Sequence, residues 1–150
     1  MRKYVNGLFG LLIAAGIALQ FVPVERTNPA TLGGPEVSDK LQWALRRACY
    51  DCHSNETRWP IWAYVAPSSW FVIRDVELAR SILNFSEWAL YEPAHRVALR
   101  TIIGSTTASH RMPLWYYVSL HPDSSLTDTE IDALSAWSKV SPARESPPHR

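Results

Sequence analysis

Five consecutive residues, Cys49-Tyr50-Asp51-Cys52-His53, contain both cysteines of this 150-residue chain. Two thiols three residues apart project from one side of a turn and can reach the two vinyl groups of a porphyrin. The adjoining imidazole is then carried beneath the ring, where it can bind the iron. The spacing therefore predicts covalent attachment of one haem c through Cys49 and Cys52, with His53 as the proximal iron ligand.

Two other uses of a cysteine pair compete with this interpretation. A disulfide is the default state of two cysteines in an exported protein, and a redox-active pair normally follows a strand, whereas the residues before Cys49 have a helical pattern. A zinc site would need a fourth ligand, and the sequence contains no further cysteine and no histidine pair at zinc-finger spacing. Haem attachment is therefore the favoured chemistry.

An iron bound by His53 has a second axial position to fill. Met112 is the only methionine beyond the initiator, and it precedes Pro113 in a downstream loop. A thioether ligand raises the reduction potential of a haem, and proline would hold the loop in a fixed turn. Met112 could instead fill a gap in the core. We predict Met112 as the distal ligand and keep His110, which would lower the potential, as the alternative; His121 has the pattern of a surface turn residue.

Aromatic and basic residues near the motif are candidates for the rest of the pocket. Aromatic rings could wall the porphyrin, and arginines could pair its propionates. The candidates are Trp59, Trp62, Tyr64, Trp70, Arg58, Arg74 and Arg111. Taken one at a time, each is more often a core or solvated residue.

The N-terminus predicts the compartment. Arg2 and Lys3 precede an apolar run that has the length of a signal-peptide core when counted to Leu19, and just spans a bilayer when counted to Val24. We favour an uncleaved membrane anchor over residues 1–24, because cleavage among the small residues 14–18 would leave an apolar new terminus. The basic end stays in the cytoplasm, so the rest of the chain is expected in the periplasm, at the cytoplasmic membrane.

Helical patterns fill most of the remaining chain. Residues 25–37 have the prolines and glycines of a linker, residues 38–140 form the predicted domain, and residues 141–150 are expected to be disordered. One helix begins after Ser38, with Leu41, Leu45 and Ala48 on the face that leads to the cysteines. The others are a helix from about Ser68 with Phe71, Val72, Val76 and Ala79 inside, a helix from Pro93 that closes before Gly104, and a final helix after the capping box Thr127–Glu130. The pattern predicts an all-α domain.

Composition narrows the possible functions. The formal net charge of +1 offers no electrostatic case for nucleic-acid binding. Seven tryptophans and six tyrosines against six glycines predict a small core of large rings. Such a core gains from a bulky apolar cofactor that completes it.

The region from about Ser38 to Trp137 resembles the bacterial haem-binding domain family, a cytochrome c-like group carried behind an N-terminal membrane anchor. Three runs carry the resemblance: residues 49–60, residues 66–88, and Met112-Pro113 with Tyr117, His121-Pro122 and Leu126-Thr127-Asp128. The resemblance implies one covalently bound haem and a helical domain, and no defined enzymatic reaction. Relatives of this kind usually carry an acidic residue before the methionine-proline pair. Here His110-Arg111 precede it, which keeps bis-histidine ligation open.

These observations predict one-electron transfer at the periplasmic face of the membrane, with redox partner proteins that the sequence does not name. Two other classes remain. A haem-based redox or gas sensor would leave the sixth iron position open or weakly held. A peroxidase-type enzyme would need a distal acid–base group, which His110 could supply if Met112 is not a ligand.

Overall fold

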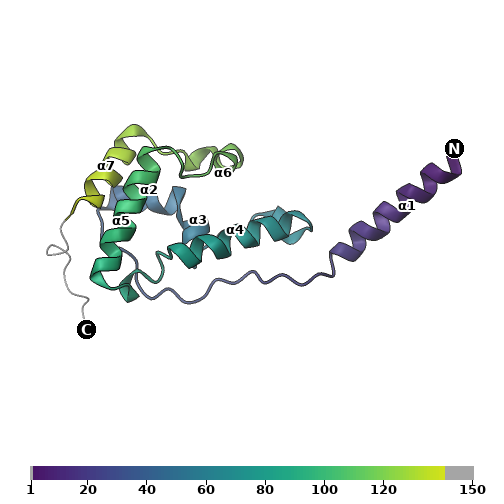
Figure 1. The fold of residues 1–150 in the computed structure, drawn as a ribbon, viewed down its shortest axis with the longest axis horizontal. Coiled ribbons are helices and arrows are strands. Elements are labelled where there is room, and N and C mark those ends of the chain that lie inside the picture. The colour runs from purple at the N-terminus through teal and green to yellow at the C-terminus, as the bar shows by residue number, and fades with distance from the viewer. Residues whose placement is uncertain (1, 141–150) are drawn as a thin grey trace.

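The computed structural model describes residues 2–140, which fold into seven α-helices and contain no strand (Figure 1). The helices are α1 (Arg2–Leu19), α2 (Asp39–Ala48), α3 (Tyr50–His53), α4 (Ser68–Ile82), α5 (Pro93–Ala108), α6 (Trp115–Leu120) and α7 (Asp128–Ser138). Three short 3₁₀ helices lie between them: η1 (Ile61–Tyr64), η2 (Trp88–Leu90) and η3 (Pro122–Ser124). The all-α prediction is confirmed. The predicted disordered tail, residues 141–150, lies outside the described residues.

The core forms where α5 and α7 pack against each other and α2 packs on α7, at the end of the molecule far from α1 (Figure 1). Leu41, Leu45 and Ala48 are buried on one stripe of α2, as predicted from their helical spacing. Large aromatic and aliphatic side chains complete the cluster. Its buried members are Leu41, Leu45, Tyr50, Leu83, Phe85, Trp88, Leu99, Ile103, Leu134 and Trp137.

Helix α5 begins at Pro93 as predicted but does not close before Gly104; it continues to Ala108. Gly104 lies against α7, where an added Cβ would stand 2.7 Å from the side chain of Ser138. The glycine is therefore a point of close approach between two helices and does not terminate the helix. The capping box that begins α7 is present as predicted, with the Thr127 hydroxyl accepting from the Glu130 backbone and the Glu130 carboxylate accepting from the Thr127 backbone.

Helix α4 begins at Ser68, as predicted, and most of the face expected to lie inside does so: Val76 is buried, and Val72 and Ala79 are half-buried. Ser69, Ile73 and Val76 are buried at spacings of four and three residues, whereas Phe71 is 62% exposed. The helix packs mainly on α3 and η1, so a single narrow stripe meets the domain. The placement of Phe71 on the inner face was wrong.

Residues 20–37 run without regular structure along the domain, apart from one isolated β-bridge between Gly33 and Glu87. Asn28 donates its side-chain amide to the carbonyl of Thr57 at 2.9 Å, and the amide of Leu32 donates to the carbonyl of Ser86 at 2.7 Å. Helix α1 extends away from the domain and buries no residue (Figure 1). Among the described residues it is the one helix long and apolar enough to cross a membrane, a test that a signal sequence also passes.

Candidate functional site

The two cysteines lie at the junction of α2 and α3. Cys49 caps α2, with its amide bonded to the carbonyl of Leu45 at 2.8 Å, and its backbone leaves the helical region before α3 begins. The amides of Cys52 and His53 both bond back to the carbonyl of Cys49, at 3.2 and 2.9 Å. Both thiols are free and half-buried, so the structure holds no disulfide between them. The predicted trio of Cys49, Cys52 and His53 is thus brought together on one helical turn.

The environment of the thiols keeps them neutral. Burial, together with the neighbouring Cys52, raises the pKa of Cys49 to about 12. Burial, with the negative charges of Asp51 and Asp75, raises the pKa of Cys52 to about 11. Metal ligation by cysteine needs the thiolate. Among residues 2–140, no three His, Cys, Asp or Glu side chains are grouped so that they could hold a metal ion.

The backbone of α4 and of the turn that follows orients His53. Its Nδ1 lies 3.1 Å from the carbonyl oxygens of both Ala79 and Leu83. Both neighbours only accept hydrogen bonds, so Nδ1 carries the proton and Nε2 keeps its lone pair. Burial lowers the pKa of His53, so the ring is neutral at physiological pH. A neutral imidazole with one nitrogen held by a backbone carbonyl is the usual form of a histidine metal ligand.

The two residues between the cysteines fix the motif to the domain. The Tyr50 ring is buried and stacks on Phe85 at 5.1 Å between ring centroids. The Asp51 carboxylate accepts from the Arg58 guanidinium at 3.0 and 3.1 Å and from the Tyr117 hydroxyl at 2.7 Å. Burial alone would raise the pKa of Asp51, but these hydrogen bonds outweigh it and hold the pKa below its ordinary value. Arg58, which we considered as a propionate partner, instead pairs with this carboxylate.

The candidate distal ligands lie on the loop after α5. The amide of Met112 donates to the carbonyl of Thr106 at 3.2 Å, and the Met112 side chain is half-buried. His110 is exposed and has a φ of 51°, a left-handed conformation suited to a turn. Both residues come from an element separate from the turn that carries the cysteines.

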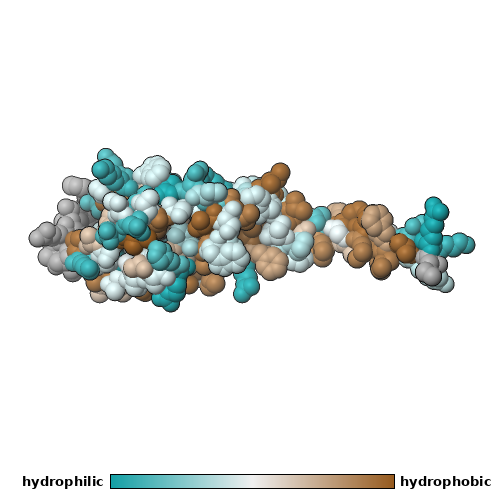
Figure 2. All heavy atoms as spheres, turned by 90° about the horizontal axis from the view of Figure 1, so that it is seen from above, coloured by the Kyte–Doolittle hydropathy of each residue, from teal (hydrophilic) through white to brown (hydrophobic). Residues whose placement is uncertain are grey.

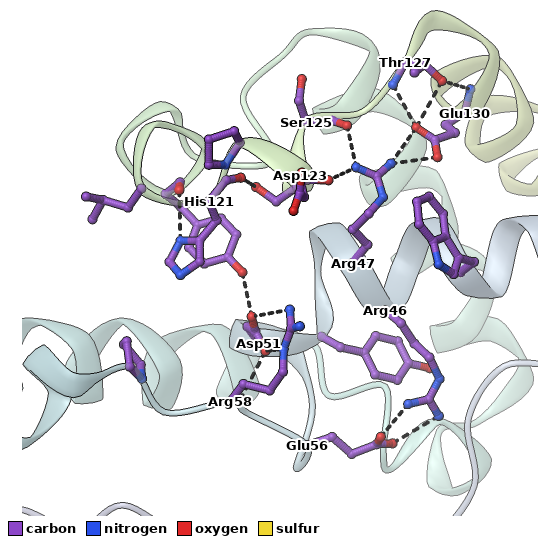
Figure 3. Close-up of a pocket in the computed structure, with 17 residues that line it drawn as sticks. Arg46, Arg47, Asp51, Glu56, Arg58, His121, Asp123, Ser125, Thr127 and Glu130 are labelled. Carbon is purple, nitrogen blue, oxygen red and sulfur yellow. Dashed lines mark hydrogen bonds and ion pairs between the residues drawn. The ribbon is translucent and has the colours of Figure 1, made fainter.

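Next to the motif lies an open groove of about 1210 Å³ between α2, α3 and the α6–α7 region (Figure 3). Neither cysteine, nor His53, nor Met112 lines it. Figure 3 shows three arginines along it, each paired with a carboxylate: Arg46 with Glu56, Arg47 with Glu130, and Arg58 with Asp51. Arg47 also donates to the carbonyls of Asp123 and Ser125. Ion pairs therefore line this groove, and that of Arg47 with Glu130 joins α2 to α7, which are distant in sequence.

The other aromatic candidates fall into different surroundings. Trp62 lies 5.9 Å from the ring of His121. Tyr64 is exposed beneath the guanidinium of Arg26. Trp59 lies 5.9 Å from Arg80. Trp70 is the exceptional one, because its indole Nε1 is buried and has no hydrogen-bond partner in the structure.

Sequence reasoning missed two groups that hold the segment after the motif. Arg80 on α4 donates to the carbonyl of Ser54 and to the hydroxyl of Thr57, each at 2.8 Å. The side-chain amide of Asn84 donates to the side-chain oxygen of Asn55 at 2.9 Å in a buried contact. An arginine on a helix and an asparagine in a turn give no local signal of such roles, because their partners are brought near only by the fold.

Comparison with known proteins is consistent with this geometry. A family model described as a haem-binding domain matches residues 14–140, which is most of the chain. No curated protein and no solved structure gives a match. With the cysteines, the oriented imidazole and this match taken together, the chain belongs to the haem-binding domain family.

Proposed function

We propose that this protein is a membrane-anchored c-type cytochrome that transfers single electrons in the periplasm. Haem binding follows from the family; covalent attachment, the iron ligands and electron transfer are the proposal. The observation that carries it is the orientation of His53, whose Nδ1 is occupied by two backbone carbonyls and whose Nε2 is left for a metal. A bound haem would supply reversible one-electron chemistry between ferric and ferrous iron.

The cysteines have the chemistry that attachment requires. Each thiol would add across one vinyl group, its sulfur bonding to one carbon and its hydrogen to the next, so no oxidant is consumed. Cys49 and Cys52 are both free, and both lie on the turn that carries His53. Tyr50 and Asp51, held by Phe85 and Arg58, keep the turn rigid while it carries a large group.

The structure also contains a buried hydrogen-bond donor that a polar group of the cofactor could satisfy. The Nε1 of Trp70 is a buried donor without an acceptor, and such a group costs about 1–3 kcal/mol when nothing satisfies it. A haem propionate is an acceptor of the right charge, so Trp70 would hold it. Exposed apolar side chains on α4, including Leu78 and Ile82, would likewise gain from contact with a porphyrin face.

Met112 is our proposed distal ligand, with His110 as the alternative. The half-buried position of Met112 supports this choice, and the exposed left-handed turn at His110 counts against the histidine. A thioether ligand would keep the sixth iron position closed, which suits a carrier of electrons better than a sensor or a peroxidase.

Covalent haem staining of denatured protein tests the proposal. The wild-type chain is expected to keep its haem through denaturing electrophoresis, and Cys49→Ala combined with Cys52→Ala is expected to lose it. A reduced-minus-oxidised spectrum of the native protein must then show reversible one-electron reduction. Retention of stain in the double variant would contradict the proposal of covalent attachment. A haem that cannot be reduced reversibly would contradict the proposal of electron transfer.

A further inference from the structure

Exposed apolar side chains gather where the domain meets its N-terminal helix. We call this set the anchor-side patch: Phe21 and Val22 just after α1, with Ile61, Tyr64 and Val65 at η1. Their exposed fractions are 81, 47, 79, 58 and 51%. Figure 2 shows hydrophobic atoms on the N-terminal helix and again on the adjoining end of the domain. Leaving so much contiguous apolar surface in water is unfavourable, and such patches mark contact surfaces.

Direct hydrogen bonds join the residues that follow α1 to η1 and to the residues just after it. The side chain of Gln20 accepts from the amide of Ala66 at 3.0 Å and donates to the carbonyl of Ala66 at 3.2 Å. The guanidinium of Arg26 donates to the carbonyl of Ala63 at 3.0 Å and lies 4.6 Å over the ring of Tyr64. The two parts of the patch are therefore held side by side, although they are about forty residues apart in sequence.

The length of α1 sets the height of this junction relative to a membrane. Its 18 residues rise by about 27 Å, slightly less than the roughly 30 Å of a hydrocarbon core. With α1 spanning the bilayer, Gln20 lies at the outer boundary of the hydrocarbon, and Ala66, bonded to it, lies at the same level. Tyrosine and tryptophan side chains are favoured in that layer because one end is apolar and the other polar.

We propose that the anchor-side patch lies in the outer interfacial layer of the phospholipid bilayer and seats the haem domain on the membrane in a fixed orientation. This inference rests on the proposed membrane anchor. Ile61 and Val65 would enter the acyl boundary, while Tyr64 and Arg26 would face the headgroups. The domain would then contact lipid at η1 as well as through α1. It would not rotate freely about residues 20–37, which connect it to α1.

Lipid photocrosslinking of the full chain tests this. The photoreactive residue p-benzoylphenylalanine replaces Tyr64 in one protein, Trp43 in a second and Phe9 in a third, and each is reconstituted in phosphatidylethanolamine–phosphatidylglycerol vesicles. Trp43 is the matched control, an aromatic residue of 60% exposure on α2. Phe9 reports on the anchor itself. We expect lipid adducts, identified by peptide mass, at positions 9 and 64 and not at position 43.

The outcomes separate the two claims. Adducts at position 9 without any at 64 would overturn the patch and leave the anchor intact, as would equal labelling at 43 and 64. A crosslink from 64 to a second protein chain would also overturn the patch. Absence of lipid at position 9 as well would overturn the anchor and the patch together. A second substitution, at Ile61, guards against a local effect of replacing Tyr64, and it must also label lipid.

Discussion

At the scale of single residues, the hydrogen bonds of His53 determine what its ring can do. The carbonyls of Ala79 and Leu83 belong to the last turn of α4 and the residue beyond it, and that of Ala79 also accepts from the amide of Leu83 at 2.9 Å. The imidazole uses both of them. Because that leaves Nε2 as the basic nitrogen, the His53 ring is already oriented for the proximal-ligand role that we propose for it.

Met112 gives the first prediction. Met112→Ala is expected to abolish the weak absorption band at the red end of the visible spectrum that a sulfur ligand gives to ferric haem, and to lower the reduction potential. His110→Ala, as the matched control on the same loop, is expected to keep both. A wild-type ferric protein without this band, together with a reduction potential that changes in His110→Ala and not in Met112→Ala, would contradict the assignment and point to the histidine.

The second prediction concerns the hydrogen bond from Tyr117 to Asp51. Tyr117→Phe removes a 2.7 Å hydrogen bond to the Asp51 carboxylate, and we expect a loss of about 1–2 kcal/mol in the free energy of unfolding, because bonds to charged groups are the stronger ones. Tyr116→Phe, which removes a 3.0 Å bond from a more exposed tyrosine to Asp75, is expected to cost less than about 1 kcal/mol. Urea unfolding of both variants measures the difference, and equal losses would refute the argument.

At the scale of helices, the contact of α5 with α7 depends on the missing side chain of Gly104. Alanine improves helix propensity by about 1 kcal/mol. Its Cβ, however, would stand 2.7 Å from both Cβ and Oγ of Ser138, so the helices must move apart. We expect Gly104→Ala to destabilise the domain by about 1–3 kcal/mol, as measured by chemical unfolding. Gly104→Ala with Ser138→Gly should recover most of the loss, and an unrecovered double variant would show that the clash is not the cause.

Glu130, in the first turn of α7, makes the free energy of unfolding depend on pH. Burial alone would raise the pKa of Glu130, but hydrogen bonds from Thr127 and Arg47 outweigh it and hold the pKa below its ordinary value. A carboxyl whose pKa is lower in the folded state stabilises the fold fully above its unfolded pKa of about 4.5, and loses that contribution as the pH falls through the lowered value. The unfolding free energy of Glu130→Gln should therefore fall less steeply than that of the wild type as the pH drops below about 4.5. Parallel curves would contradict this.

At the scale of the whole molecule, the local sequence pattern was enough to locate most helices. Where a helix ends and which of its side chains are buried depended also on contacts with other helices. Thr127 and Glu130 are a local signal, and the capping box formed as expected. Gly104 carries the usual signal of a helix end, but a neighbouring helix needed the space. Phe71 fits the helical stripe that contains the buried Val76, yet Phe71 itself is 62% exposed. In the site, adjacent residues identified the cysteines and His53, whereas the partners of Asp51 and His53 lie on other elements, which no spacing along the chain reveals.

The whole-chain arrangement also predicts how the protein partitions in cells. If α1 is the membrane anchor that we propose, with Arg2 and Lys3 at its cytoplasmic end, the intact mass should include residues 2–19, and the protein should stay in the membrane pellet after alkaline washing. Leu11→Arg places a charge in the middle of α1, at a cost of about 2.5–3.5 kcal/mol for insertion, and should release a large share of the chain. Leu32→Arg, at an exposed position beyond the helix, is the control and should stay bound.

Protease added to spheroplasts should digest the domain. Recovery of a soluble chain that begins after residue 14 would instead identify α1 as a signal peptide.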